Sequence, residues 1–227
     1  CISQWGFHFR PEYRKIGGYL RDFGAVQKLA LTATAHAATR LDICRFINLC
    51  DPKVIMAPVL RDNLRLRIFR QKKVSEQLTV LLQSVLSSEG AGIIYAPTRK
   101  RVDELYDVLQ RAGITVVRYH AGMSGYERQS AQDAFLQNEV RVIVSTSPFV
   151  LGINKASIRF VYHVGVPAAV EQYVQEIGRA GRDGLTAKCY LFFTSKDLFI
   201  QDFILQKSLP DLKVVKNCLN KIDTAAA

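Results

Sequence analysis

Short apolar segments alternate with longer amphipathic segments along most of the chain. Eight of the short segments are rich in Val, Ile and aromatic residues, a composition typical of buried strands. They cover residues 27–34, 53–57, 64–70, 91–96, 115–120, 140–146, 158–164 and 187–193. Because helical patterns separate most of these segments, the sequence predicts an α/β fold in which helices cover a mostly parallel sheet. Ligands of such a sheet are expected at the carboxyl ends of its strands.

Two of the separating segments carry clear helix signals. In the first, Val102, Leu105 and Leu109 recur at helical spacing, and a glycine follows as a stop signal. In the second, Ser124 and Glu127 have the spacing of a capping box, in which each residue satisfies a backbone N–H of the other. Both segments are therefore predicted to be helices that pack on the sheet.

A third helix is predicted over residues 170–182. At about 100° per residue, one face of this helix would carry apolar side chains and the opposite face polar ones. The apolar face would consist of Val170, Tyr173, Val174 and Ile177, and the polar face of Gln175, Arg179 and Arg182. The planar fork of an arginine side chain suits phosphate oxygens. The glycines of the GRAGRDG stretch, residues 178–184, would let a ligand approach closely, which favours an anion site over an ordinary solvated face.

A change in composition divides the chain near residues 57–63, where a proline and polar residues interrupt the strand pattern. Residues 1–58 contain too few elements for a core of their own and are predicted to be the last part of a larger domain. Residues 59–194 form the predicted α/β unit, and residues 195–227 are predicted to be a helical extension.

Charge and composition narrow the possible partners. The 227 residues carry 31 Lys and Arg against 20 Asp and Glu, a formal net charge of +11, which favours a polyanion such as nucleic acid. No apolar run reaches the roughly 18 residues of a membrane span, so no membrane partner and an intracellular location are expected. The five cysteines contain no C-x-x-C pair, and no metal site is predicted.

Six segments together resemble the RecQ helicases, a family within helicase superfamily two. Residues 175–184, QEIGRAGRDG, resemble the family's last motif, and residues 1–13, CISQWGFHFRPEY, resemble the aromatic-rich loop that follows its DEAH box. The other four are LTATA at 31–35, GIIYAPTR at 92–99, YHAGM at 119–123 and STSPFVLGINK at 145–155. All six occur in the family's order.

The resemblance implies two RecA-like lobes with ATP and Mg²⁺ between them. Residues 1–58 would be the C-terminal part of the first lobe and residues 59–194 the complete second lobe. The first lobe's phosphate-binding loop and DEAH box would precede Cys1, and no G-x-x-x-x-G-K-[ST] stretch occurs in the sequence. The chain alone is therefore expected not to hydrolyse ATP.

The resemblance also assigns residues to the nucleotide. Arg182 and Arg179 would act as arginine fingers on the γ-phosphate, and Gln175 would sense the nucleotide. Gly152 and Asn154 would lie beside it. Both residues belong to the motif at 145–155. Where the family usually has A-F-G-M-G-I-N-K, this chain has Pro148, Phe149, Val150 and Leu151 before the glycine. Val150 in place of a glycine restricts the backbone.

A second set of residues is predicted to contact DNA. Trp5, Phe7, Phe9 and Arg10 combine aromatic faces for bases with a cation for phosphate. By resemblance, their loop senses single-stranded DNA, although Phe7-His8 replaces the family's usual His-Asp. The resemblance adds Thr98, Arg99, His120, Thr146 and Lys155 in the second lobe, and gives Thr32 and Thr34 the coupling of the two sites.

The activity implied is that of an ATP-dependent helicase that moves 3′ to 5′ on single-stranded DNA and unwinds duplex DNA. Its partners would be single-stranded and forked DNA. It would lie in the cytoplasm or nucleoid of a bacterium or in the nucleus of a eukaryote. The alternative is a nucleic-acid-binding module derived from a helicase core that does not hydrolyse ATP. A phosphate-binding loop upstream of the chain would favour the helicase.

Overall fold

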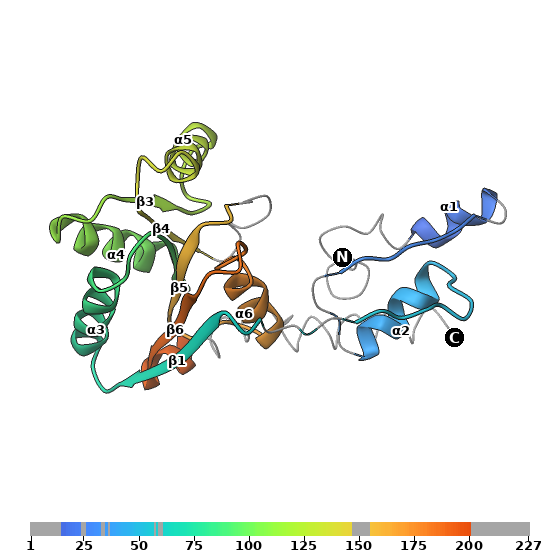
Figure 1. The fold of residues 1–227 in the computed structure, drawn as a ribbon, viewed down its shortest axis with the longest axis horizontal. Helices are drawn as coiled ribbons and strands as arrows, with labels where there is room; N and C mark the ends of the chain where they lie inside the picture. The colour runs from blue at the N-terminus through green and yellow to red at the C-terminus, as the bar shows by residue number, and fades with distance from the viewer. Residues whose placement is uncertain are drawn as a thin grey trace, which may run out of the picture. The chain divides into compact units, whose positions relative to one another are not determined.

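The structure is a computed structural model that describes residues 15–23, 26–32, 35, 37–56, 58, 61–146 and 155–200. The chain forms two compact units, residues 1–61 and 62–227 (Figure 1). The assignment of these units to two lobes and a helical extension stays a prediction.

The first unit contains the helices α1 (Ile16–Asp22) and α2 (Ala37–Phe46). Their backbones come close at Gly17, where any Cβ atom would collide with the carbonyl oxygen of Phe46. In the same unit Lys28 Nζ donates a hydrogen bond of 3.2 Å to the carbonyl oxygen of Asn48. Glycine is therefore required at position 17 for this approach.

Two predicted strands of the first unit are wrong over the residues that the structure describes. Residues 26–32 and 53–56 are not in strands, although they carry the apolar pattern of strands. A strand needs neighbouring backbone to complete its hydrogen bonds, and no ladder to either segment is formed within the described ranges. Leu29, Leu31 and Ile55 are accordingly more than four-fifths exposed, at 81%, 84% and 84%.

The second unit is built around a six-stranded parallel sheet with the strand order β1-β6-β5-β2-β4-β3. The strands are β1 (Leu64–Gln71), β2 (Ala91–Tyr95), β3 (Val116–Tyr119), β4 (Val142–Ser145), β5 (Ile158–Val164) and β6 (Ala187–Thr194). The six predicted strands in this part of the chain are confirmed. The central strands β2, β4 and β5 are almost completely buried, which explains why most of their residues are apolar.

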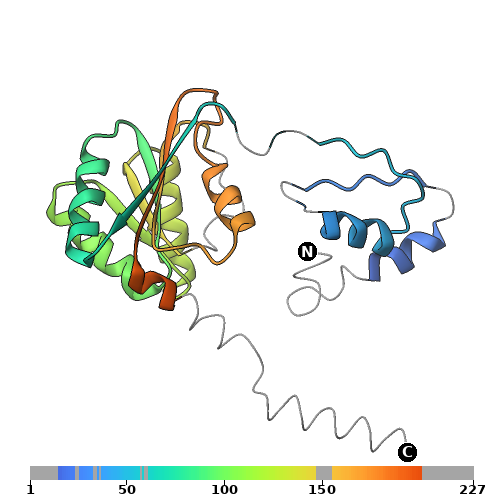
Figure 2. The same ribbon diagram turned by 90° about the horizontal axis from the view of Figure 1, so that it is seen from below.

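Helices cover both faces of this sheet. They are α3 (Val74–Leu86), α4 (Arg99–Arg111), α5 (Gly125–Leu136) and α6 (Val170–Ile177). Val85 of α3 and Leu105 of α4 belong to the core on one face, and Phe135 of α5 and Ile177 of α6 to the core on the other. Figure 2 shows α3 and α6 on opposite sides of the sheet. The predicted parallel sheet flanked by helices is confirmed.

Side-chain caps begin two of the helices, and the capping box predicted for the second is confirmed. The side chain of Thr98 caps α4 by accepting a hydrogen bond of 3.2 Å from the backbone N–H of Arg101. Ser124 and Glu127 form the complete capping box of α5, with bonds of 3.2 and 2.8 Å. None of the helices within the described ranges is long and apolar enough to cross a membrane.

Candidate functional site

The GRAGRDG stretch lies in a loop rather than in a helix. The predicted helix over residues 170–182 is wrong beyond Ile177, where α6 ends. Single-turn hydrogen bonds follow, from the N–H of Arg179 to the carbonyl oxygen of Glu176 at 3.2 Å and from Ala180 to Ile177 at 3.0 Å. Gly181 then adopts a φ of 55°, which is unfavourable for residues with a Cβ atom. We call residues 178–186, between α6 and β6, the arginine loop.

The predicted division of α6 into two faces is only partly correct. Ile177 is buried, but Val170, predicted on the same apolar face, is 75% exposed. Glu176 is 3% exposed, because its carboxylate has a buried histidine partner. Gln175 and Arg182 are exposed and Arg179 is half-buried, so the three predicted polar residues do not share one solvent-facing surface.

Asn63 is distant in sequence from the arginine loop but stabilises it through hydrogen bonds. Its Nδ2 atom donates hydrogen bonds of 2.8 Å to the carbonyl oxygens of Gly181 and Leu185, and its own carbonyl oxygen accepts one of 3.0 Å from Ala187. A Cβ atom at Gly181 would lie 2.6 Å from Asn63 Nδ2. Asn63 is not among the predicted site residues, because nothing near it in sequence signals a partner 118 residues away.

A second clamp on the loop is the ion pair between Arg159 and Asp183. Nη2 of Arg159 lies 2.6 Å from both carboxylate oxygens of Asp183. The hydrogen bond from Arg159 holds the pKa of Asp183 below its ordinary value of 3.8. Asp183 also accepts a bond of 3.1 Å from the backbone N–H of Leu185. The acidic residue of the motif therefore shapes the loop.

The electrostatics of the two arginines suit an anion. Burial lowers the pKa of Arg179, and the nearby charge of Arg182 lowers it further. Nε of Arg179 is buried and has no hydrogen-bond partner among the described residues. An oxyanion placed between the two guanidinium groups would relieve their repulsion and accept the unused N–H. The described residues thus fit a phosphate group at this position.

Candidate nucleic-acid residues gather at the carboxyl ends of neighbouring strands. Thr98 and Arg99 follow β2, His120 follows β3, and Thr146 follows β4. Arg99 is exposed and its Cδ atom lies near Gly122 of the loop after His120. The arginine loop runs instead toward the amino ends, since Gly181 donates a hydrogen bond of 2.8 Å to the carbonyl oxygen of Ile158, the first residue of β5. The expectation that all ligands gather at the carboxyl ends does not describe this loop.

His120 is engaged on both ring nitrogens. Its Nε2 lies 3.1 Å from Asp103 Oδ1, and its Nδ1 accepts a hydrogen bond of 3.2 Å from the N–H of Gly122. Arg118 donates a bond of 2.8 Å to the same Asp103 oxygen. Because both nitrogens have partners within the protein, this geometry favours a structural role for His120 over the predicted DNA contact.

The burial and hydrogen bonds of Lys155 argue more strongly against its predicted DNA contact. It is 7% exposed, and its ammonium group donates to the carbonyl oxygens of Phe135 and Leu136 and to Asn138 Oδ1 at 2.6, 3.3 and 2.6 Å. These acceptors close the C-terminal end of α5, where a cation is favourable. Burial lowers the pKa of Lys155. All three donors are used inside the protein, so this lysine stabilises a helix end.

The remaining predicted site residues are either lightly constrained or outside the described residues. Thr146 is half-buried and its N–H donates to the carbonyl oxygen of Tyr119 at 3.3 Å, and Thr32 is exposed. Seven predicted residues lie outside the described residues: Trp5, Phe7, Phe9, Arg10, Thr34, Gly152 and Asn154. The sequence departures at residues 7–8 and 148–151 lie there as well.

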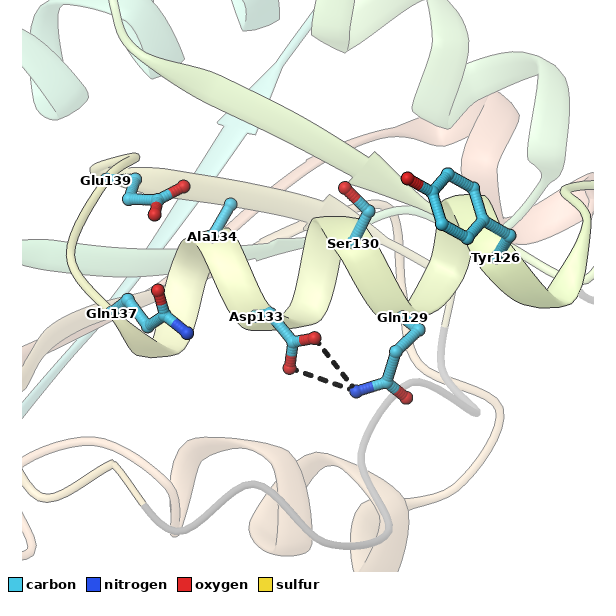
Figure 3. Close-up of a pocket in the computed structure, with 7 residues that line it drawn as sticks. All are labelled: Tyr126, Gln129, Ser130, Asp133, Ala134, Gln137 and Glu139. Carbon is cyan, nitrogen blue, oxygen red and sulfur yellow. Dashed lines mark hydrogen bonds between the residues drawn. The ribbon is translucent and has the colours of Figure 1, made fainter.

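A shallow hollow on the outer side of α5 is the other candidate for a ligand (Figure 3). Tyr126, Gln129, Asp133 and Glu139 are among its lining residues, and Gln129 bonds to the carboxylate of Asp133 at 2.9 and 3.1 Å. Its two carboxylates would repel a phosphate, so the hollow does not compete with the arginine loop. Within the described ranges no group of three His, Cys, Asp or Glu side chains could hold a metal ion.

Comparisons with other proteins identify relatives over most of the chain. A family model described as the helicase conserved C-terminal domain matches residues 73–184. The chain is 42% identical over 209 residues to the ATP-dependent DNA helicase RecQ of Pasteurella multocida, covering 91% of this chain and 33% of that protein. The ATP-dependent helicase SGS1 of Saccharomyces cerevisiae is 36% identical over 230 residues, covering 100% of this chain and 16% of that protein. The chain therefore spans about a third or less of the length of these relatives.

Solved structures with a similar fold include yeast Dbp5 bound to RNA and ADP BeF3. The TM-score is 0.69 at 20% identity, covering 93% of this chain and 55% of that chain. The C-terminal domain of the DEAD-box protein Dbp5 is similar at a TM-score of 0.53 and 25% identity, over 66% of this chain and 88% of that chain. These likenesses support the RecA-like fold predicted for the parallel sheet.

Proposed function

We propose, on the premise that this chain belongs to the RecQ family of DNA helicases, that it is part of the motor of an ATP-dependent DNA helicase. Residues 59–194 would act as the second RecA-like lobe and residues 1–58 as part of the first. Because the chain spans about a third of its bacterial relatives, the activity is assigned to the longer protein. Closure of the two lobes would convert ATP hydrolysis into movement along DNA.

The observation that carries this proposal is the arginine loop. Arg182 is exposed, Arg179 is half-buried beside it, and the loop is held by Asn63 and by the Arg159–Asp183 pair. A loop fastened at both sides presents its guanidinium groups in a preorganised position, which is what stabilisation of a charged transition state requires. Arg182 would contact the transferring phosphoryl group, and Gln175 would sense the nucleotide.

ATP with Mg²⁺ would supply the phosphoryl group that is hydrolysed. The sequence contains no G-x-x-x-x-G-K-[ST] stretch, so the residues that cradle the triphosphate would come from elsewhere in the longer protein. The part played by this chain would be to place one or two cations against that phosphate from the facing lobe. Gly152 and Asn154 stay predicted neighbours of the nucleotide.

On the DNA side, Thr98, Arg99 and Thr146 would follow the backbone of a single strand at the carboxyl edge of the sheet. Trp5, Phe7, Phe9 and Arg10 would sense the bases, and Thr32 and Thr34 would link this sensing to the nucleotide site. Translocation from 3′ to 5′ and unwinding of forked DNA belong to the same proposal. The location would be the cytoplasm or nucleoid of a bacterium, or a eukaryotic nucleus.

The test is ATP hydrolysis by the full-length protein with and without single-stranded DNA. A DNA-stimulated rate, together with unwinding of a fork that has a 3′ single-stranded arm, is the expected result. Absence of hydrolysis at saturating ATP, Mg²⁺ and DNA would overturn the helicase assignment and favour a nucleic-acid-binding module. The chain alone serves as the control and should not hydrolyse ATP.

A further inference from the structure

A buried polar cluster lies behind the arginine loop. Its members are Tyr95 at the end of β2, His163 in β5 and Glu176 in α6, which are 4%, 2% and 3% exposed. Nε2 of His163 lies 2.7 Å from Glu176 Oε2. The rings of Tyr95 and His163 are stacked with their centroids 5.2 Å apart. The proposed chemistry does not by itself explain why these polar side chains are buried here.

The cluster and Arg179 hold most of the unsatisfied polar atoms of the described residues. Four buried side-chain atoms in the described ranges lack a hydrogen-bond partner, and three of them are the Tyr95 hydroxyl, His163 Nδ1 and Arg179 Nε. Each such atom destabilises the fold, because it loses its hydrogen bond to water on burial and gains none in return. Because three of these four unsatisfied atoms lie next to the proposed site, we infer that their burial serves a function and is not incidental to packing.

Arg179 is joined to this cluster through its backbone and its charge. Its N–H donates a hydrogen bond of 3.2 Å to the carbonyl oxygen of Glu176. Burial lowers the pKa of the guanidinium, and interactions with Tyr95 and Glu176 oppose this effect. Tyr95 stacks on His163, which pairs with Glu176, so the three side chains form one connected group next to Arg179. Burial raises the pKa of Tyr95 far above neutral, and the hydroxyl therefore stays protonated. Arg179 thus lies against a neutral dipole and near a paired carboxylate.

The position of Tyr95 in the chain connects the two candidate sites. It is the last residue of β2, and Thr98 and Arg99 follow it directly at the start of α4. Its ring lies in the core under the arginine loop, together with Ile177 and Ala180. A shift of residues 96–99 when they engage a DNA strand would therefore be transmitted to the neighbour of Arg179.

We propose that Tyr95 is a positioning residue for Arg179, whose guanidinium it holds in place through its hydroxyl while the His163–Glu176 pair fixes its ring. Arg182 then contacts the phosphate from the exposed part of the arginine loop. A movement at the end of β2 shifts Tyr95 and thereby changes the position of Arg179 relative to the nucleotide. This inference rests on the proposed function, because it assigns Tyr95 a role in the same hydrolysis.

The test is a double-mutant cycle on hydrolysis by the full-length protein. Tyr95→Phe removes only the hydroxyl and should lower kcat about tenfold in saturating single-stranded DNA, with the KM for ATP changed by less than about twofold. Arg179→Ala should lower kcat about 100-fold. If Tyr95 acts through Arg179, the double variant should match Arg179→Ala within about twofold. Losses that multiply, or a normal kcat for Tyr95→Phe, would overturn the proposal.

Tyr162→Phe is the matched control, since it also removes a buried tyrosine hydroxyl. Tyr162 bonds to Ser88 at 2.8 Å and lies in the core on the other face of the sheet. Its variant should lower the unfolding temperature and leave kcat unchanged. Tyr95→Phe should do the reverse. The unfolding temperature should change little, because the hydroxyl that is removed is buried without a hydrogen-bond partner, and kcat should fall, because Arg179 loses the hydroxyl dipole beside its guanidinium. Should Arg179→Ala and Arg182→Ala both hydrolyse ATP normally, the proposed function itself fails, which separates that outcome from failure of Tyr95→Phe alone.

Discussion

Arg182 and Lys155 are both basic residues of motifs that resemble those of a helicase, yet the structure places them in opposite environments. Arg182 lies in the exposed part of the arginine loop, which Asn63 and Arg159 hold from outside. Lys155 is 7% exposed and gives its three donors to the end of α5. The same kind of charge is therefore exposed at the surface in one region and used inside the fold in the other.

This difference shows what a motif match can and cannot assign. A motif match identifies a basic residue at a given position. Whether that residue can bind a ligand depends on the hydrogen-bond acceptors that surround it in the folded chain. Two carbonyl oxygens at a helix end and Asn138 Oδ1 accept from all three donors of Lys155, whereas Nε of the half-buried Arg179 has no partner among the described residues. An unused donor, rather than a basic residue as such, is what supports the proposed anion site.

The largest expected effect comes from removing the presented cation. Arg182→Ala in the full-length protein should lower the rate of ATP hydrolysis by about 10³-fold or more, because the contact forms chiefly in the transition state. Affinities for nucleotide and for single-stranded DNA should change by less than about threefold. Arg182→Lys should fail nearly as badly, since an ammonium group cannot reproduce the planar fork. Near-normal turnover with a normal melting curve would make Arg182 an ordinary surface charge.

Lys155→Met should affect stability instead of catalysis. Loss of a charged donor to three acceptors should lower the free energy of unfolding of this chain by about 2–3 kcal/mol, measured by urea denaturation. The salt dependence of single-stranded DNA binding should stay as in the wild type. Lys196→Met, at an exposed position, is the stability control.

Arg99→Ala provides the opposite control for the same experiment. Arg99 is exposed at the start of α4, so its loss should leave stability unchanged. It should weaken single-stranded DNA binding and reduce the salt slope by about 0.7. A reduced salt slope for Lys155→Met would show that this lysine does reach DNA. The contrast between Lys155 and Arg182 would then be wrong.

A smaller effect is expected from loosening the arginine loop. Asn63→Ala removes both hydrogen bonds to the carbonyl oxygens of Gly181 and Leu185 and should cost about 1–2 kcal/mol of stability. Hydrolysis by the full-length protein should fall about threefold to tenfold. Asn63→Asp should be at least as harmful, because a carboxylate would face two carbonyl oxygens. Equal activity of Asn63→Ala and the wild type would mean that the arginine loop does not need the hydrogen bonds from the residue before β1.

The smallest effect concerns the exposed Arg159–Asp183 pair and depends on pH. The pKa of Asp183 is lower in the folded chain than its ordinary 3.8, so its stabilising effect is complete above that value. It is lost as pH falls through the lower folded pKa. Thermal unfolding of the wild type and Asp183→Asn should therefore differ at pH 6 and converge as the pH falls through the lowered pKa of Asp183. A difference that persists in acid would indicate that the carboxylate does not act through its charge.

Comparison of two apolar segments shows the limit of reading strands from a sequence. Residues 91–96 and residues 27–32 have similar patterns, but only the first contain a strand. Ala91–Tyr95 lies between β4 and β5, which complete its backbone hydrogen bonds on both sides. The second segment pairs with no strand in the part of the chain that the structure describes. Periodicity reports which side chains can be buried, whereas pairing depends on distant backbone.

The end of α6 shows the same limit for helices. The 3.6-residue pattern continues through Arg182, but the helix ends at Ile177 because Gly181 turns to reach the carbonyl oxygen of Ile158. No pattern in the sequence around Gly181 predicts its hydrogen bond to the carbonyl oxygen of Ile158. The capping box of α5, in contrast, acts within three residues and is predicted correctly from the sequence.

Sequence patterns alone were enough to predict the six strands after residue 63, the helices between them and the motifs that resemble those of RecQ helicases. These depend on side-chain periodicity, local capping and residue identity, which are all properties of short stretches. Only the tertiary structure decided that Lys155 is buried, that Asn63 and Arg159 clamp the arginine loop, and that Tyr95 lies beside Arg179. Each of these contacts joins residues from 17 to more than 100 positions apart, because the fold, and not the neighbouring sequence, brings such partners together.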